Sequence, residues 1–157
     1  MSEKTLELTL VEAGVTARAT MFTDLAPETC RILGEALKTP VTVKTVHAMF
    51  AGPEIMTGLP AEAQTFDPTA IPNENQTCFP GAGEILWYYQ GRNAMKGLPE
   101  ELWEIGIFYG TGGRTFGPLG WTPVNIFAQI TDGLDAFAEA AAATRTEGLK
   151  TLRIECK

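Results

Sequence analysis

The sequence predicts a mainly β domain with two helices, and three observations support this prediction. Apolar and polar residues alternate with a period of two near both ends of the chain, which is typical of half-buried strands. Two central segments, residues 84–89 (EILWYY) and 102–109 (LWEIGIFY), are dense in β-branched and aromatic residues, which favour strands. Helical spacing of apolar residues occurs in two segments far apart, so strands and helices do not alternate as they do around a parallel sheet.

The first two strands form a predicted hairpin. Every second residue is apolar in residues 6–10 and again in residues 15–21, and Glu12-Ala13-Gly14 provides a turn between them. A helix over residues 27–37 follows. Pro27 suits its first turn, because the proline ring fixes φ and the missing N–H would have no partner there.

The remaining elements follow from the same signals. Residues 57–83 are rich in proline and glycine, so we expect short edge strands and loops there. Thr131 is the expected N-cap of the second helix, with Asp132 in its first turn. The other predicted elements are a strand over 41–48, a loop over 91–100, a glycine-rich polar loop over 110–120, a strand over 125–130, a helix from residue 134 and a final strand over 149–155.

Length and composition indicate one globular domain over residues 1–157. The net charge of -7 and the pI of about 4.7 disfavour nucleic acid and anionic membranes as partners, because an acidic surface repels phosphate. There is no basic and apolar export signal at the start and no run of about 18 apolar residues. Cys30, Cys78 and Cys156 are odd in number and form no C-x-x-C pair, so we expect reduced thiols in a cytoplasmic protein.

Four motifs occur in the order in which cyclophilins carry them. Ala26-Pro-Glu-Thr-Cys30 resembles the start of the first cyclophilin helix, and Val46-His47-Ala48 takes the place of a Phe-His-Arg tripeptide on the next strand. Residues 125–130 (NIFAQI) resemble the Gln-Phe-Phe-Ile strand, and residues 130–135 (ITDGLD) resemble the turn into the second helix. The resemblance implies a cyclophilin-like closed β-barrel with two covering α-helices.

More specifically, the chain is similar to a family of small, uncharacterised bacterial proteins with the cyclophilin-like fold. Its features in this sequence, along almost the whole chain, are the APETC helix start, His47, Glu74-Asn75, AGEIL at residues 82–86, Tyr109-Gly110 and the NIFAQI strand. This resemblance implies a small cyclophilin-like domain rather than a typical prolyl isomerase.

Two departures from the pattern disfavour prolyl isomerase activity. Cyclophilin isomerases use a guanidinium to polarise the prolyl amide, and Ala48 stands where that arginine is expected. Related family members tend to carry Arg-Trp-Ser-Gly after the strand histidine, whereas this chain has MFAG at residues 49–52. Both changes remove charge and hydrogen-bonding groups from the same strand end.

Candidate site residues are polar or aromatic side chains at predicted strand ends. His47, the only histidine, and Glu74 are the acid–base candidates. The ligand-binding candidates are Asn75, Tyr109, Trp121 and Asn125. His47 also fits a half-buried histidine with a satisfied hydrogen bond, and the Glu74-Asn75 pair also fits loop capping. No metal site is predicted because no second histidine or cysteine cluster accompanies His47, and no cofactor is predicted.

The leading hypothesis is that the protein binds a small polar organic ligand at the barrel mouth. In one form of this hypothesis the protein is also an enzyme, but not an isomerase. Distant strand ends meet around such an opening, which gathers the candidate side chains. One alternative is a homo-oligomer or partner-binding module whose contact is an outward aromatic strip among residues 87–121. Another is a peptidyl-prolyl isomerase, which Ala48 disfavours.

Overall fold

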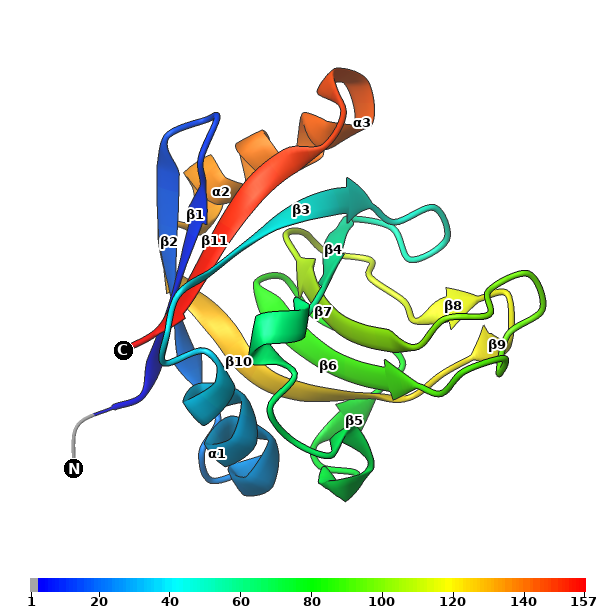
Figure 1. Ribbon diagram of the computed structural model, residues 1–157. Helices are drawn as coiled ribbons and strands as arrows, with labels where there is room; N and C mark the ends of the chain where they lie inside the picture. The colour runs from blue at the N-terminus through cyan, green and yellow to red at the C-terminus, as the bar shows by residue number, and fades with distance from the viewer. Residues whose placement is uncertain (1–2) are drawn as a thin grey trace.

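In the computed structural model, which describes residues 3–157, antiparallel strands close into a barrel (Figure 1). Their order around the barrel is β2-β1-β11-β3-β4-β7-β6-β10, and pairing of β10 with β2 closes the ring. The strands are β1 (Thr5–Leu10), β2 (Val15–Met21), β3 (Val41–His47), β4 (Glu54–Gly58), β6 (Glu84–Gln90), β7 (Leu102–Phe108), β10 (Val124–Asp132) and β11 (Lys150–Cys156). The mainly β, cyclophilin-like barrel expected from the sequence is confirmed.

Two helices cover the barrel. Helix α1 (Pro27–Ala36) and helix α2 (Leu134–Ala142) lie at opposite ends of it (Figure 1). Helix α1 buries Cys30 and Leu33, and helix α2 buries Phe137 and Ala141. The short helix α3 (Thr144–Glu147) follows α2 and leads into β11.

Alternating residues of the strands fill the inside of the barrel. Leu6, Leu8 and Leu10 of β1 point inward, as do Ile105 and Ile107 of β7. Each such side chain stabilises the fold by roughly 1.5–3 kcal/mol when fully buried. Because the interior is a packed core, the outer face and the loops are where a ligand has room.

The start of the second helix differs from the prediction. Thr131 and Asp132 belong to β10, where Asp132 pairs with Arg18 of β2 beyond a bulge, and Gly133 is the N-cap residue instead. Gly133 has φ of 82°, and a Cβ on it would lie 2.9 Å from the backbone oxygen of Thr16. The chain therefore makes a tight left-handed turn there, which glycine alone accommodates without strain.

The irregular segments contain more structure than expected. Strand β4 lies between β3 and β7 in the barrel wall, directly before the proline-rich region. That region holds two short 3-10 helices (Ala61–Ala63 and Pro68–Ala70) and β5 (Gln76–Thr77), an edge strand on β10. The glycine-rich loop folds back as a small hairpin, β8 (Phe116–Gly117) and β9 (Gly120–Trp121).

None of the helices within residues 3–157 is long and apolar enough to span a membrane.

Candidate functional site

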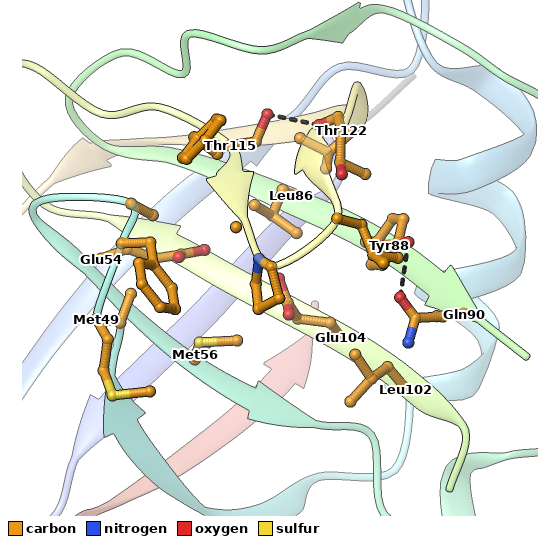
Figure 2. Close-up of a pocket in the computed structure, with 18 of the residues that line it drawn as sticks. Met49, Glu54, Met56, Leu86, Tyr88, Gln90, Leu102, Glu104, Thr115 and Thr122 are labelled. Carbon is orange, nitrogen blue, oxygen red and sulfur yellow. Dashed lines mark hydrogen bonds between the residues drawn. The ribbon is translucent and has the colours of Figure 1, made fainter. Parts of the chain in front are cut away.

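A pocket of about 290 Å³ lies on the outer face of the barrel, over β4, β7 and β6. Residues 46–51, from the end of β3 into the loop that leads to β4, form one wall, and the β8–β9 hairpin forms another (Figure 2). Strand alternation builds the floor, because residues between the core-facing ones point outward. These outward residues are Glu54 and Met56 of β4, Leu86, Tyr88 and Gln90 of β6, and Leu102 and Glu104 of β7.

Glu54 is the most deeply buried acidic residue of the pocket floor, with 3% of its surface exposed. Its Oε2 atom has no hydrogen-bond partner. The carboxyl group occupies the space above Gly106 of β7, where a Cβ would overlap Oε2. Burial raises the pKa of Glu54 well above its ordinary value, and the charge of Glu104 raises it further.

Glu104 lies on the same floor, on the neighbouring strand. Burial raises its pKa from 4.5 to about 7. Figure 2 shows its carboxyl group and that of Glu54 turned toward the same part of the pocket. Two carboxyl groups in a weakly hydrated site do not readily ionise together, so at neutral pH the pair retains a proton. The pair then presents one hydrogen-bond donor and several acceptors to the pocket.

Gln90 and Tyr88 form a second polar group on the floor. The Tyr88 hydroxyl donates to Gln90 Oε1 at 3.1 Å, while Gln90 Nε2 is buried and without a partner. Tyr88 stands opposite Glu104 in the β6–β7 register, and burial followed by the charge of Glu104 raises the pKa of Tyr88. In either orientation of the Gln90 amide, one of its polar atoms is left for another molecule.

The rest of the lining is mostly apolar. Among the described residues around the pocket there is no lysine or arginine, so the carboxyl pair has no cationic partner there. The site is therefore a hydrophobic space with an acidic floor. The apolar lining side chains include Met49, Phe50, Met56, Leu86, Leu102 and Leu119.

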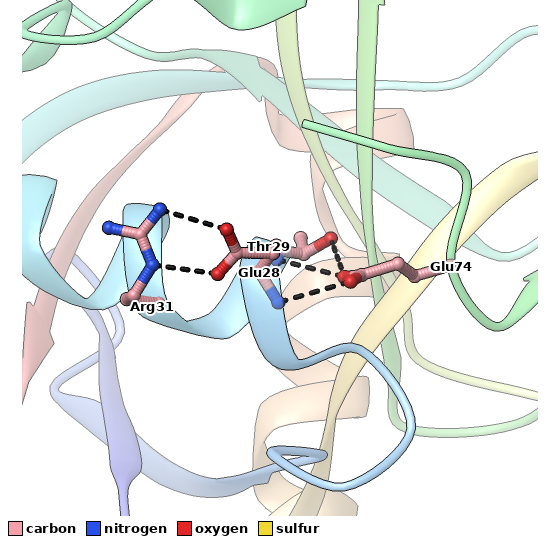
Figure 3. A network of polar contacts seen from close by, with 4 residues as sticks. All are labelled: Glu28, Thr29, Arg31 and Glu74. Atoms are coloured by element: carbon pink, nitrogen blue, oxygen red, sulfur yellow. Dashed lines mark hydrogen bonds and ion pairs between the residues drawn. The ribbon is translucent and has the colours of Figure 1, made fainter. Parts of the chain in front are cut away.

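Glu74 and Asn125 meet elsewhere, at the start of helix α1. Glu74 Oε1 accepts from the backbone N–H of Glu28 at 3.1 Å, and Oε2 accepts from the N–H and hydroxyl of Thr29 at 2.9 and 2.8 Å (Figure 3). Asn125 donates to the Thr29 hydroxyl at 3.0 Å and accepts from the backbone N–H of Glu74 at 3.2 Å. Since the N-cap residue Ala26 has no polar side chain, Glu74 caps the helix from a distant loop.

Asn75 shapes the same loop. It has φ of 46°, a left-handed conformation that asparagine tolerates better than most residues, and its amide donates to the Ile126 carbonyl at 2.9 Å. Asn125 also lines a smaller hollow of about 220 Å³, together with Asn73, Gln76 and Tyr89.

His47 forms a separate cluster with Tyr109 and Arg145. His47 Nε2 lies 2.7 Å from the Tyr109 hydroxyl, and Arg145 Nε donates to the same nitrogen at 3.1 Å. Because an arginine only donates, Nε2 carries a lone pair, and Nδ1 carries the proton that it donates to the Ala48 carbonyl at 2.8 Å. These contacts fit the tautomer of His47 that carries its hydrogen on Nδ1.

Trp121 lies on β9 and packs its ring 5.2 Å from those of Phe79 and Phe116. The structure thus distributes the six candidate residues over three places and does not gather them at one opening. Of the six, His47 alone lines the acidic pocket. Trp121 belongs to the hairpin that covers this pocket.

The sequence reasoning did not identify Glu54, Glu104 or Gln90. Glu104 carried a signal, since it is the one charged residue within the apolar strand LWEIGIFY. Gly106 carried another, because a glycine in a strand interior often marks a close approach of another group. Glu54 had no comparable signal, as it directly follows a turn.

Comparison with solved structures shows that the fold is shared with cyclophilins. The structure of McbB in complex with tryptophan superposes with a TM-score of 0.67 at 18% identity, over 96% of this chain and 44% of McbB. A mimivirus cyclophilin gives 0.57 at 9% identity, over 98% of this chain and 87% of its own length. A hypothetical protein of Archaeoglobus fulgidus, AF2241, gives 0.52 at 15% identity, over 98% and 94% of the two chains.

The chain spans less than half of McbB, and the low identities show a common fold alone. No curated protein matches the sequence. A family model matches residues 8–156, nearly the whole chain. The chain therefore belongs to the family described as protein of unknown function (DUF3830), which here has the cyclophilin-like fold.

Proposed function

We propose that this protein binds a small organic molecule in the pocket between β4, β7 and the β8–β9 hairpin. The ligand has an apolar body and a neutral or cationic polar end that hydrogen-bonds to Glu54 and Glu104. The buried Oε2 of Glu54, which has no partner, is the observation that supports this proposal.

A buried polar atom without a partner costs about 1–3 kcal/mol, so a ligand that pairs with it gains affinity from the contact. Apolar walls remove the body of the ligand from water, and the polar floor fixes its orientation. The acidic floor and the net charge of -7 disfavour anionic ligands. This refines the expected polar organic ligand and moves its site from the barrel mouth to the outer face.

One part of this proposal, the apolar body with an amino group, also occurs in the ligand of McbB, whereas the carboxylate of that ligand does not suit the acidic floor described here. The solved McbB structure is a complex with tryptophan, a molecule with an aromatic body and an amino group. For our chain we propose the shared chemistry only, a compact apolar body next to a nitrogen or carbonyl group.

Three probes with the same ring test the proposal: cyclohexylamine, cyclohexanone and cyclohexanecarboxylate. Tryptophan fluorescence follows binding, because Trp121 on the covering hairpin is 54% exposed whereas Trp87 and Trp103 are at most 9% exposed. We expect saturable signals with the amine and the ketone and none with the carboxylate. Shifts of backbone amide NMR signals in β4 and β7 locate the contact.

A bound ammonium group favours the ionised form of Glu54, and a charged hydrogen bond contributes roughly 1.5–3 kcal/mol. The variant Glu54→Gln is therefore expected to weaken the binding of cyclohexylamine by about tenfold or more. Glu100→Gln, in an exposed loop, is the control. Equal binding of the carboxylate and the amine, or no effect of Glu54→Gln, would contradict the proposal.

A second candidate function is self-association through the rim of the pocket. Large apolar side chains are exposed around it, and such patches often mark contact sites on proteins. Sedimentation at increasing concentration tests a dimer of this chain, with Trp121→Ser as the disrupting variant. The exposed rim residues are Met49, Phe50, Phe79, Phe116, Leu119 and Trp121.

Prolyl isomerase activity has no support from the pocket, whose lining includes Ala48 and supplies no guanidinium. We further propose a cytoplasmic location for the protein, which is supported by the free thiols of Cys30, Cys78 and Cys156.

A further inference from the structure

We infer that Glu54 and Glu104 are an acid–base pair that enolises carbonyl compounds bound in the acidic pocket. The substrate class is a ketone or aldehyde with an apolar body and a hydrogen on the carbon next to the carbonyl group. The inference rests on the proposed binding function and adds a reaction to it.

Strands β4 and β7 bring Glu54 and Glu104 into one pocket. The two strands are hydrogen-bonded neighbours, and each carboxyl group emerges from the outer face of its strand. Gly106 leaves room for the Glu54 side chain to lie across β7, on the strand that carries Glu104. A small molecule in this pocket therefore meets one carboxyl group from each strand.

The two groups differ in environment. Glu54 is 3% exposed, and burial raises its pKa well above the ordinary value, which favours the carboxylic acid form that donates a hydrogen bond. Glu104 is open to the pocket on one side, and its pKa of about 7 suits a general base near neutral pH. Apolar walls strengthen the hydrogen bond to the oxygen on which negative charge develops.

The reaction needs no further reactant. The Glu104 carboxylate takes the proton from the carbon next to the carbonyl, and the electrons of that C–H bond form the carbon–carbon double bond of the enol. The carbonyl π electrons move to oxygen, which takes the proton of Glu54. Glu104 then returns a proton to carbon while the enol hydroxyl returns its proton to Glu54. When the proton on Glu104 exchanges with solvent before its return to the same carbon, the hydrogen of that carbon is replaced. In a 2-hydroxycarbonyl compound, return of the proton to the former carbonyl carbon, while the neighbouring hydroxyl gives its proton to Glu54, yields the isomeric hydroxycarbonyl compound.

Deuterium incorporation into cyclohexanone tests the inference. The ketone is incubated in D2O with the protein, and loss of the signal from the hydrogens next to the carbonyl is followed by NMR. We expect exchange about 10²-fold to 10⁴-fold faster than with the double variant Glu54→Gln/Glu104→Gln, which is the usual contribution of positioned acid and base groups. Glu100→Gln is expected to leave the rate unchanged.

The single variants separate the roles. Glu104→Gln removes the base and is expected to abolish the acceleration, whereas Glu104→Asp retains a carboxylate and part of the rate. Glu54→Gln still donates a hydrogen bond and is expected to retain more activity than Glu54→Leu. The rate of the unmodified protein rises with pH through the pKa of Glu104 and falls where Glu54 ionises. The other titratable residues that line the pocket are Tyr88 on β6 and His47 on β3.

Each outcome bears on one of the two proposals. Binding of cyclohexanone without exchange above the double variant overturns the acid–base inference and leaves the binding function in place. Absence of binding by all neutral and cationic probes overturns both. Circular dichroism of every variant confirms that it is folded before its rate is compared.

Discussion

The Cα atom of Gly106 lies beneath the carboxyl group of Glu54, in the position where a side chain would exclude that group. A Cβ on Gly106 would overlap Glu54 Oε2 and approach Leu86 Cδ2 to 3.0 Å. A glycine on β7 is therefore what allows an acidic residue of β4 to be buried over the neighbouring strand. The acidic pocket floor depends on this pair.

Gly106→Ala is expected to displace the Glu54 side chain and to destabilise the protein by about 1–3 kcal/mol, the usual cost of overpacking. Urea denaturation measures the loss. The substitution is expected to cost less in a Glu54→Ala background, because the overlapping atoms are then absent. Gly58→Ala on β4 is the control, since a Cβ there meets no atom within 4 Å. Equal costs in the two backgrounds would show that Glu54 does not occupy this space.

Stability is expected to fall as the pH rises from 5 to 8. The pKa of Glu104 is raised from 4.5 to about 7 in the folded protein, so the folded state holds more protons than the unfolded chain in this interval. Its contribution is complete below pH 4.5 and is lost as the pH passes through 7, a change of about 3 kcal/mol. Glu54, whose pKa is also raised, adds to the loss.

Urea denaturation at pH 5, 6, 7 and 8 checks this dependence. Glu104→Gln is expected to flatten the profile and to be more stable than the unmodified protein at pH 8. Glu12 does not contribute to the change in stability between pH 5 and 8. Hydrogen bonds from Thr151 lower its pKa from 4.5 to about 2, so its effect on stability is confined to pH values below 4.5. A profile that is flat in the unmodified protein would mean that neither carboxyl group is buried as described.

Glu74→Ala is expected to destabilise the protein by about 1–2 kcal/mol, as the loss of a helix N-cap does. The two N–H groups at the start of α1 and the Thr29 hydroxyl lose their acceptor. Thermal unfolding measures the effect, with Glu100→Ala as the control. Retention of cyclohexylamine binding by the folded variant would assign Glu74 to the helix, whereas loss of binding without loss of stability would assign it to the site.

His47 is expected to carry a proton on Nδ1, which donates to the Ala48 carbonyl. The nitrogen chemical shifts of the imidazole ring distinguish the tautomers, and the chain has a single histidine, so the signals need no assignment. Arg145→Ala and Tyr109→Phe are expected to change the Nε2 shift, because they remove its two partners. A proton on Nε2 in the unmodified protein would exclude the contact with Arg145.

Much of the fold could be predicted from the chain. Strands form where the sequence predicts them at residues 6–10, 84–89 and 102–109. The first of these has the alternation of a half-buried strand, and the other two have a high content of aromatic and β-branched residues. The motifs at the start of α1 and in β10 indicated the barrel. The start of the second helix was misplaced at Thr131, because strand β10 continues through a bulge at Thr131 to Asp132, which pairs with Arg18 of β2. The local preference for a helix N-cap was outweighed by pairing with a strand that lies more than 100 residues away in the chain.

The sequence by itself determined most strands of the barrel, the presence of the two covering helices and the family, since these follow from periodicity and from short motifs. The tertiary structure decided which polar groups meet. Glu74 joins helix α1 rather than His47, and Glu54 and Glu104 line one pocket from the neighbouring strands β4 and β7. These arrangements of distant polar side chains depend on strand register and on the space that a single glycine leaves. The local sequence around each of the two residues does not specify either feature.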